Sequence, residues 1–259
     1  MSGYKDFAAC YKLLQSGVDY DGMAALVHRL IDTYGDEHEC VVDLACGCGD
    51  VSFRLARLGY YVIGVDVSEA MLYEAEKGLA EYPDLRDSVT FVRQDMSELE
   101  LWGAADAVVC LLDSINHLES VEKLEKTVER VSMFTCDGGL FIFDVNTEFK
   151  HTQVLGSNSF VFEEDGLLCT WRNFCGRRGD VEIMLDFFSR NRDGSYDRSS
   201  EYFVEKLFGP ELLEGLLKKY CFEVIAVFDG FSQDPPGEET ERLLYVCKRL
   251  PGGRGAQAE

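Results

Sequence analysis

Three aspartates, each at the end of a short apolar run, are the residues whose type and spacing best suit ligand binding. Asp66 follows VIGV, Asp95 follows FVRQ and Asp113 follows VVCLL. A lone aspartate after a strand is usually a turn residue or a helix cap. The carboxyl ends of parallel strands meet at one edge of a sheet, however, so three such acids would lie close together. Together they indicate acceptors for the hydroxyl and amino groups of a ligand.

The segment VVDLACGCGD, residues 41–50, predicts the turn that would bring a ligand to these acids. An apolar run ends in small residues, Gly47 and Gly49 follow, and Asp50 begins a segment with helical apolar periodicity. Such glycines allow a sharp turn and a close approach of the backbone to a ligand. A strand, a glycine turn, a helix and a second strand ending in Asp66 predict a nucleoside-binding unit, with the acid on the ribose hydroxyls.

A nicotinamide dehydrogenase is the first alternative, because it also combines a glycine turn with a ribose-binding acid. The third glycine of G-x-G-x-x-G is absent here, since Gly47 and Gly49 are followed by Ser52. Asp43 also lies within the strand, where it would repel a pyrophosphate. The pattern therefore favours a cofactor without phosphate groups.

Apolar periodicity predicts an α/β fold, a doubly wound and mostly parallel seven-stranded sheet with an antiparallel β insertion after the fifth strand. The expected strands of the parallel part are residues 40–45, 61–65, 89–93, 107–112 and 140–145, with helices at 50–59, from Ser68 to Pro83 and at 121–134. Asp137-Gly138-Gly139 is expected to stop the last of these helices. A helix from Pro210 and a final strand pair complete the core.

One domain is expected over residues 1–250. Its parts are a helical cap (1–38), a core (39–150 and 209–250) and an antiparallel insertion (157–208), and the tail 251–259 is expected to be disordered. The insertion is expected to be antiparallel because its segments alternate polar and apolar residues between turn signals. It is expected to cover the ligand crevice or to form a homodimer contact.

With these motifs the chain resembles the class I S-adenosylmethionine-dependent methyltransferases, whose first motif is similar to VVDLACGCGD. The resemblance implies that Asp66 binds the ribose diol and Asp95 the adenine amino group. It also implies further cofactor contacts from Tyr11, Tyr20, Ala45, Gly47, Gly49, Val67, Met71, Met96 and Leu111. Of these, Val67, Met71 and Met96 would surround the adenine ring.

Candidate catalytic residues also come from the resemblance. The segment DSINHL, residues 113–118, is similar to one in sugar-amine and other small-molecule N-methyltransferases, which implies that His117 is a general base. YKLLQSGVDY is similar to the N-terminal helix that covers the cofactor in such enzymes, so Tyr11 would orient the substrate. Periodicity alone assigns Tyr11 and Tyr20 to packing. The segment DVNTEFKH lacks the aromatic residues expected of sugar-amine enzymes, which leaves a small-molecule acceptor open to nitrogen or oxygen, with an amine favoured.

Composition excludes several classes of partner. The 47 acidic against 25 basic residues give a formal net charge of −22, and nucleic-acid binding requires a basic face. No apolar run reaches the ~18 residues of a membrane helix and MSGYKDF is no signal peptide, so a cytoplasmic protein without membrane contact is expected. The ten cysteines and four histidines show no ligand spacing, which predicts no metal.

Two other functions share these features. A catalytically silent protein that binds S-adenosylmethionine or S-adenosylhomocysteine would keep the cofactor motifs. An aminopropyl transferase of the same fold would add a paired-acid polyamine site, for which the sequence gives no candidate.

Overall fold

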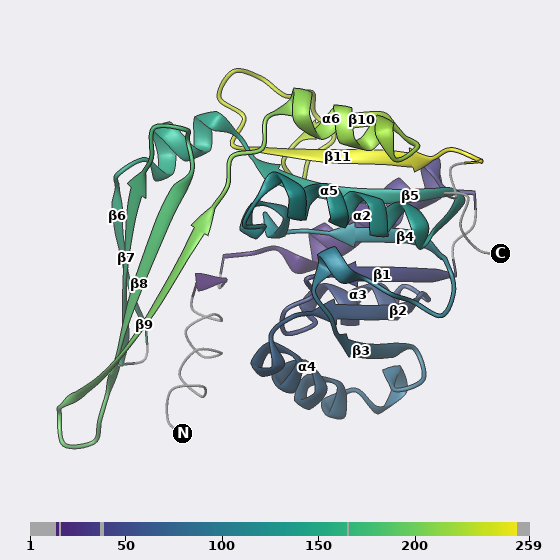
Figure 1. The fold of residues 1–259 in the computed structure, drawn as a ribbon. Helices are drawn as coiled ribbons and strands as arrows, with labels where there is room; N and C mark the ends of the chain where they lie inside the picture. The colour runs from purple at the N-terminus through teal and green to yellow at the C-terminus, as the bar shows by residue number, and fades with distance from the viewer. Residues whose placement is uncertain (1–13, 16, 37–38, 165, 253–259) are drawn as a thin grey trace.

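The computed structural model describes residues 14, 15, 17–36, 39–164 and 166–252, and these form two β-sheets with flanking helices (Figure 1). The larger sheet has seven strands in the order β10-β11-β5-β4-β1-β2-β3. Its strands are β1 (Cys40–Leu44), β2 (Tyr61–Asp66), β3 (Val89–Arg93), β4 (Ala105–Cys110), β5 (Thr135–Asn146), β10 (Phe222–Asp229) and β11 (Arg242–Arg249).

Strands β1 to β5 are parallel, and β11 and β10 add an antiparallel pair at one edge. Val42 is in register with Ile63 of β2 and with Val108 of β4. The chain order reverses between β1 and β4, and in such sheets the ligand crevice lies outside the carboxyl ends at this point. The predicted mostly parallel, doubly wound sheet is therefore confirmed.

Helices cover both faces of the large sheet because its strands are apolar on both sides. On one face Leu30 and Leu55 pack in the same cluster as Val41 and Val109. The helices are α2 (Tyr20–Tyr34), α3 (Asp50–Arg57), α4 (Glu69–Glu81), α5 (Val121–Met133) and α6 (Pro210–Lys219). Residues of α2, α3 and α4 belong to the first cluster, and those of α5 and α6 to the cluster on the opposite face.

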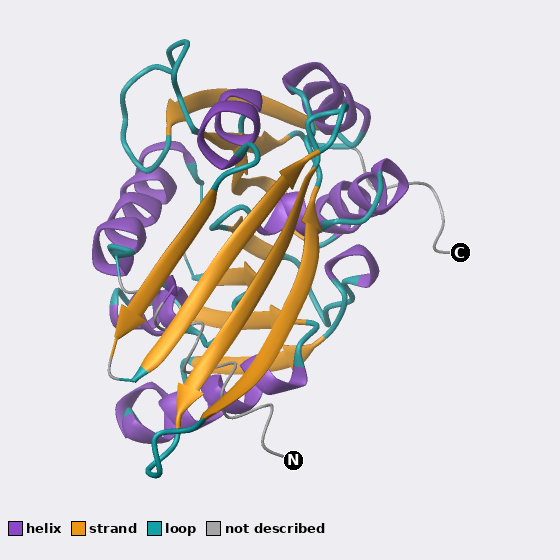
Figure 2. Ribbon diagram, turned by 90° about the vertical axis from the view of Figure 1, so that its left-hand side faces the viewer, coloured by secondary structure: helices purple, strands orange, loops and turns teal. Residues whose placement is uncertain are grey.

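The second sheet is the antiparallel meander β6-β7-β8-β9, formed by β6 (Ser159–Glu164), β7 (Leu167–Cys175), β8 (Val181–Arg190) and β9 (Tyr196–Glu205). It stands in front of the carboxyl ends of the parallel strands (Figures 1 and 2). Two hydrogen bonds join it to the segment after β4: the Lys206 amide donates to the Asn116 carbonyl at 2.7 Å, and Asn116 Nδ2 donates to the Lys206 carbonyl at 2.8 Å. The predicted antiparallel insertion is confirmed.

Several strand boundaries differ from the prediction, and two of the differences have a clear physical cause. β4 ends at Cys110, before Leu112 and Asp113, because both of these residues have left-handed φ angles of 57° and 53° that end the extended conformation. β5 begins at Thr135 and contains the glycine pair that was expected to form a turn. The pairing of β4 with β5 shifts its register between Ala105 and Ala107 of β4, so the two glycines form a bulge within β5.

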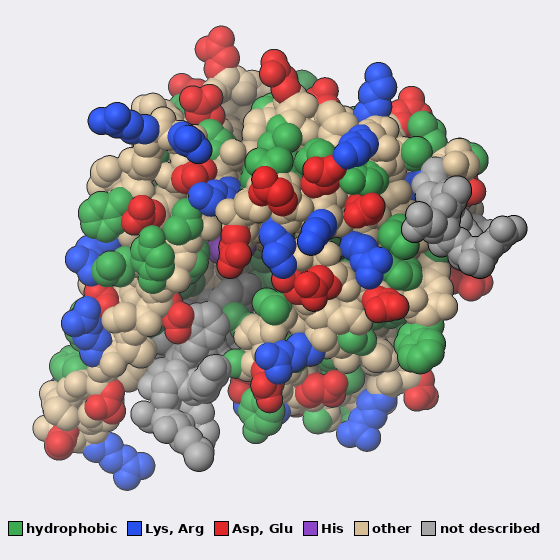
Figure 3. Space-filling model, in the orientation of Figure 1, with side chains coloured by type: hydrophobic (Ala, Val, Ile, Leu, Met, Phe, Trp, Pro, Cys, Tyr) green, Lys and Arg blue, Asp and Glu red, His purple; other side chains and the backbone are tan. Residues whose placement is uncertain are grey.

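The surface carries the charge seen in the composition. Acidic and basic side chains are interspersed on the face shown in Figure 3, with no continuous basic area. Among the described residues, no helix is long and apolar enough to span a membrane.

Candidate active site

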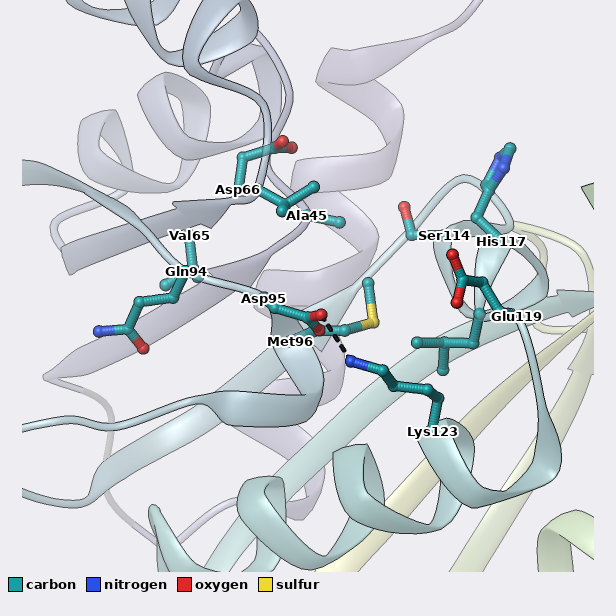
Figure 4. Close-up of a pocket in the computed structure, with 12 residues that line it drawn as sticks. Ala45, Val65, Asp66, Gln94, Asp95, Met96, Ser114, His117, Glu119 and Lys123 are labelled. Carbon is teal, nitrogen blue, oxygen red and sulfur yellow. Dashed lines mark hydrogen bonds and ion pairs between the residues drawn. The ribbon is translucent and has the colours of Figure 1, made fainter. Parts of the chain in front are cut away.

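A cavity of about 280 Å³ opens at the carboxyl ends of β1, β2 and β3 and beside η3 (Ser114–His117), the 3₁₀ turn after β4. Figure 4 shows the Asp66 carboxylate at one side of this cavity and Asp95 directed toward Lys123. Gln94 and His117 lie at its opposite ends. A smaller cavity of about 30 Å³ adjoins it, and Ala45 and Ser114 line both.

Asp66 is fixed by the backbone of the turns on either side of it. Its Oδ2 accepts a hydrogen bond from the Gly47 amide and its Oδ1 one from the Ser68 amide, both at 2.8 Å. Burial raises the pKa of Asp66, and these two hydrogen bonds oppose the rise. Each carboxylate oxygen keeps a second acceptor position, so the side chain can accept two hydroxyl groups of a ligand.

Asp95 is more heavily engaged than the sequence predicts. Its Oδ1 accepts hydrogen bonds from the amide and the hydroxyl of Ser97, and its Oδ2 one from Lys123 Nζ at 2.9 Å. Burial alone would raise the pKa of Asp95, but the bonds from Lys123 and Ser97 hold it below its usual value. Asp95 therefore stays ionised, with one acceptor position left on Oδ2 for a ligand amino group.

The turn after β1 has the conformation that its glycines allow. Ala45, Gly47 and Gly49 all have positive φ angles, of 61°, 55° and 81°. A Cβ on Gly49 would lie 2.7 Å from the Phe91 ring, so a larger residue would displace this turn. The backbone amide of Gly47 thereby reaches Asp66, which links the turn to the ligand-binding carboxylate.

The smaller cavity is acidic. Its walls include Asp43, Asp50, Tyr20 and Leu111. Asp43 is buried, and burial raises its pKa to about 6 although its Oδ2 accepts a hydrogen bond from the Ser52 hydroxyl at 2.6 Å. Burial also raises the pKa of Tyr20, which therefore stays a neutral phenol. The acidic walls suit the ammonium group of an amino acid moiety.

His117 lines the larger cavity and not the smaller one, at the end opposite Gln94 (Figure 4). Residues three apart in a 3₁₀ helix have eclipsed side chains, so His117 lies on the same side of η3 as Ser114. The His117 side chain is exposed, and its ring centroid lies 5.0 Å from that of Phe203 on β9. This position allows His117 to exchange a proton with a molecule bound in the larger cavity.

Beneath η3 a buried arginine holds two carboxylates. Arg242 of β11 forms ion pairs with Asp113 and with Asp144 of β5. Burial would raise the pKa of Asp113, but Arg242, His117 and Lys150 lower it to about 2. Asp113 is therefore an anion at every pH at which the protein would act.

The comparisons with known proteins agree with this geometry. The model of a methyltransferase domain matches residues 41–139. YqeM of Bacillus subtilis (strain 168), named as a methyltransferase, is 30% identical over 249 residues, which cover 95% of this chain and 97% of YqeM. A crystal structure of an S-adenosylmethionine-dependent methyltransferase from Clostridium acetobutylicum ATCC 824 is 30% identical, with a TM-score of 0.85 over 95% of this chain and 99% of that one. This chain belongs to the S-adenosylmethionine-dependent methyltransferases.

A third structure shares the fold of this methyltransferase. The sugar N-methyltransferase KedS8 from Streptoalloteichus sp ATCC 53650 is 21% identical, with a TM-score of 0.78 over 94% of this chain and 92% of that one. A superposition over 94% of this chain must include the second sheet as well as the core, because the meander is too large a part of the chain to be left out.

The cofactor of the methyltransferase is S-adenosyl-L-methionine, and the hydrogen-bond acceptors that line the two cavities fit it. Asp66 keeps two acceptor positions for a ribose diol, and Asp95 keeps one for an exocyclic amine. Asp43 and Asp50 line the smaller cavity, where a positively charged amino group would sit. Since Ala45 and Ser114 line both cavities, the sulfonium would lie between these two residues.

Most of the residues predicted from the sequence are brought together, although their roles toward the cofactor stay predictions. Ala45, Asp66, Val67, Asp95, Met96 and His117 line the larger cavity. Tyr20 and Leu111 line the smaller one with Ala45, and Gly47 and Gly49 form the turn beside it. Tyr11 lies outside the described residues. Met71 is absent from the linings of both cavities, and its sulfur lies 3.5 Å from Sγ of Cys48, which lines the smaller one.

Sequence reasoning missed Lys123, Ser114 and Glu205. Lys123 lies in the first turn of α5, where the helix dipole disfavours a cation. This unfavourable position is the one sequence signal that could have identified Lys123 as a functional residue. Ser114 lies within the DSINHL segment but was given no role. Asp113, His117 and Glu205 each place one potential ligand atom within 4.8 Å of the others. No spacing in the sequence predicts that Glu205 joins this group.

Proposed function

We propose that the protein transfers a methyl group from S-adenosylmethionine to the nitrogen of a small-molecule amine, with His117 as the general base. The observation that supports this proposal is the position of His117, exposed at the end of the larger cavity and one 3₁₀ turn along η3 from Ser114, which lines both cavities. An acceptor bound against His117 would lie next to the expected place of the sulfonium.

Bound S-adenosylmethionine supplies an electrophilic methyl carbon, whose bond to sulfur breaks with its electron pair left on sulfur as the acceptor nitrogen attacks. The protein must position the acceptor in line with this bond, because the electrophile is already activated. It must also remove a proton when the acceptor arrives as an ammonium, since only a free lone pair attacks. Asp66 and Asp95 would hold the adenosine, and His117 would take the proton.

Two features favour an amine over a hydroxyl acceptor. The acidic groups around η3, among them Asp113 and Glu205, attract a cation and repel an anion. KedS8, whose fold this chain shares, is a sugar N-methyltransferase.

Formation of S-adenosylhomocysteine tests the proposal. The purified protein would be incubated with S-adenosylmethionine and matched sets of amines and alcohols, and products would be measured by mass spectrometry. We expect methylated amines, and we expect His117→Ala to lower the rate at least a hundredfold with unchanged S-adenosylhomocysteine affinity in calorimetry. Methylation of alcohols alone, or full turnover by His117→Ala between pH 6 and 9, would contradict the proposal.

The homodimer expected from the sequence stays a prediction, which light scattering of the purified protein tests. The dimer contact is expected on the second sheet, which is formed within residues 157–208.

A further inference from the structure

Glu205, the last residue of β9, is a buried carboxylate with no cationic hydrogen-bond partner among the described residues. Only 3% of it is exposed. Its Oε2 accepts a hydrogen bond from Asn146 Nδ2 at 2.9 Å, which is a neutral donor. Buried charges in proteins are nearly always paired or bind a ligand. The neighbouring Lys206 does not fill this role, because its Nζ bonds to Asp180 Oδ2 at 2.8 Å.

His151, the nearest titratable side chain from η4 (Lys150–Leu155, a π-helix), does not satisfy Glu205 either. It is fully buried, and its Nδ1 lies 2.7 Å from the Gly179 carbonyl, which can only accept, so Nδ1 carries the hydrogen. Its Nε2 lies 3.4 Å from Glu205 Oε2 and makes no hydrogen bond. A buried polar atom without a partner is uncommon in proteins. A neutral His151 leaves Glu205 without a cation, and only a protonated imidazole ring would form an ion pair with it.

β9 places Glu205 beside His117, while neither Glu205 nor Asp113 lines either of the two cavities. Phe203 and Glu205 are two residues apart on a strand and so point to the same side, and Phe203 contacts the ring of His117. The paired hydrogen bonds between Asn116 and Lys206 fix this end of β9 against η3. The position of Glu205 relative to His117 is therefore set by the backbone and not by a flexible loop.

Asp113, His117 and Glu205 have the geometry of a site for one nitrogen. One ligand atom from each lies within 4.8 Å of the other two. Three atoms that lie within 4.8 Å of one another all fall within about 2.8 Å of a common point, and 2.8 Å is a normal N–H hydrogen-bond length. A primary ammonium has three N–H donors, one for each acceptor.

We propose that Asp113, His117 and Glu205 together bind the primary ammonium group of the methyl acceptor, and that Glu205 makes the enzyme selective for amines. This inference rests on the proposed function and deepens it. Two carboxylates neutralise and orient the ammonium, and a hydroxyl group, with one donor and no charge, leaves Glu205 unpaired. Leaving a buried polar group unpaired is a strong means of rejecting an analogue.

The same cluster accounts for the proton. One N–H proton of the bound ammonium passes to the imidazole nitrogen of His117, which leaves a neutral amine with a lone pair and a protonated imidazole. The carboxylates of Asp113 and Glu205 stabilise that imidazolium, since both lie within 4.8 Å of it. The charge of the cluster is thus unchanged when the proton moves from the ligand to His117.

A divalent metal ion is the other cation that such residues can bind. Arg242 already pairs with Asp113 at 2.5 Å, and a doubly charged ion next to this guanidinium would be repelled. An ammonium brings one charge and directional donors, which suits the residues present.

Methylammonium chloride, with tetramethylammonium chloride as the matched cation, tests the proposal. Each would be titrated into the S-adenosylhomocysteine complex at constant ionic strength, and the imidazole NMR signals of His117 would report binding. Tetramethylammonium has the same charge but no N–H donor. We expect methylammonium to bind at least tenfold more tightly, because one charged hydrogen bond accounts for about a tenfold difference or more.

Glu205→Gln keeps the size of the side chain and removes its charge, and Glu201→Gln makes the same change at an exposed position of β9. We expect Glu205→Gln to weaken methylammonium binding at least tenfold and Glu201→Gln to change it less than twofold. Calorimetry with S-adenosylhomocysteine shows whether each variant is folded. Should Glu205→Gln fail to fold, Glu205→Asp serves instead, because its side chain is one methylene group shorter and holds the carboxylate farther from the ligand. The same tenfold loss of methylammonium affinity is expected.

Equal methylammonium affinity in the wild type and in a folded Glu205 variant would overturn the inference, while amine methylation by the wild type would leave the proposed function standing. Loss of binding in the variant without methylation of any amine would support the cluster and contradict the proposed function. Tight, Glu205-dependent binding of Mn²⁺ would also overturn the inference, in favour of a metal site.

Discussion

Replacing Asp66 with asparagine should weaken S-adenosylhomocysteine binding by roughly ten- to a hundredfold. The carboxylate uses one acceptor position on the Gly47 amide and one on the Ser68 amide, which leaves two for the ribose hydroxyls. A hydrogen bond to a charged group contributes about 1.5–3 kcal/mol, and 1.4 kcal/mol corresponds to a tenfold change in affinity. Asparagine keeps one oxygen, which the backbone amides would occupy.

Calorimetry with S-adenosylhomocysteine and with its 3′-deoxy analogue separates the ribose contact from damage to the turn. In the wild type the missing hydroxyl should cost roughly tenfold or more in affinity. In Asp66→Asn the same omission should cost less than about twofold, because the two changes remove one interaction and are therefore not additive. Equal penalties for the analogue in both proteins would refute the assignment of Asp66 to the ribose, whatever the variant does to overall affinity.

The remaining predictions concern other carboxylates of the site. Wild-type protein should bind S-adenosylhomocysteine at least about tenfold more tightly than its inosine analogue, which has an oxygen in place of the adenine amino group. In calorimetry, Asp95→Asn should reduce this difference to about threefold, because an amide side chain can accept from the amino group or donate to the oxygen. Since burial raises the pKa of Asp43 to about 6, the folded state holds this proton more tightly, and stability should fall by about 3 kcal/mol as pH rises from about 4 to about 6. Urea unfolding of Asp43→Asn should lack this component, and an unchanged pH profile would contradict it. Arg242→Met should destabilise the protein by about 3–5 kcal/mol, because it leaves the buried Asp144 unpaired, and a loss below about 1 kcal/mol in urea unfolding would contradict the ion-pair account.

The sequence predicted the part of the site that is encoded locally. The strands ending before Asp66 and Asp95 and the glycine turn each lie within one stretch of chain, where periodicity and turn residues determine the conformation. The boundary of β5 was wrong because Gly138 and Gly139 have the composition of a turn, yet tertiary pairing with β4 keeps them in the strand as a bulge.

The contacts between distant segments were beyond sequence reasoning. Lys123 reaches Asp95 from α5, and Glu205 reaches His117 from the second sheet. Neither contact follows from residue type or spacing, since each depends on how α5 and β9 pack against the core. Met71 packs against Cys48, and its expected place beside the adenine ring stays a prediction.

A crystal structure of the complex with S-adenosylhomocysteine tests the central claim most directly. We expect both ribose hydroxyls within hydrogen-bond distance of Asp66, the adenine amino group at Asp95, and the sulfur between Ala45 and Ser114, facing His117. A ribose that contacts neither oxygen of Asp66, or a sulfur turned away from His117, would contradict the account.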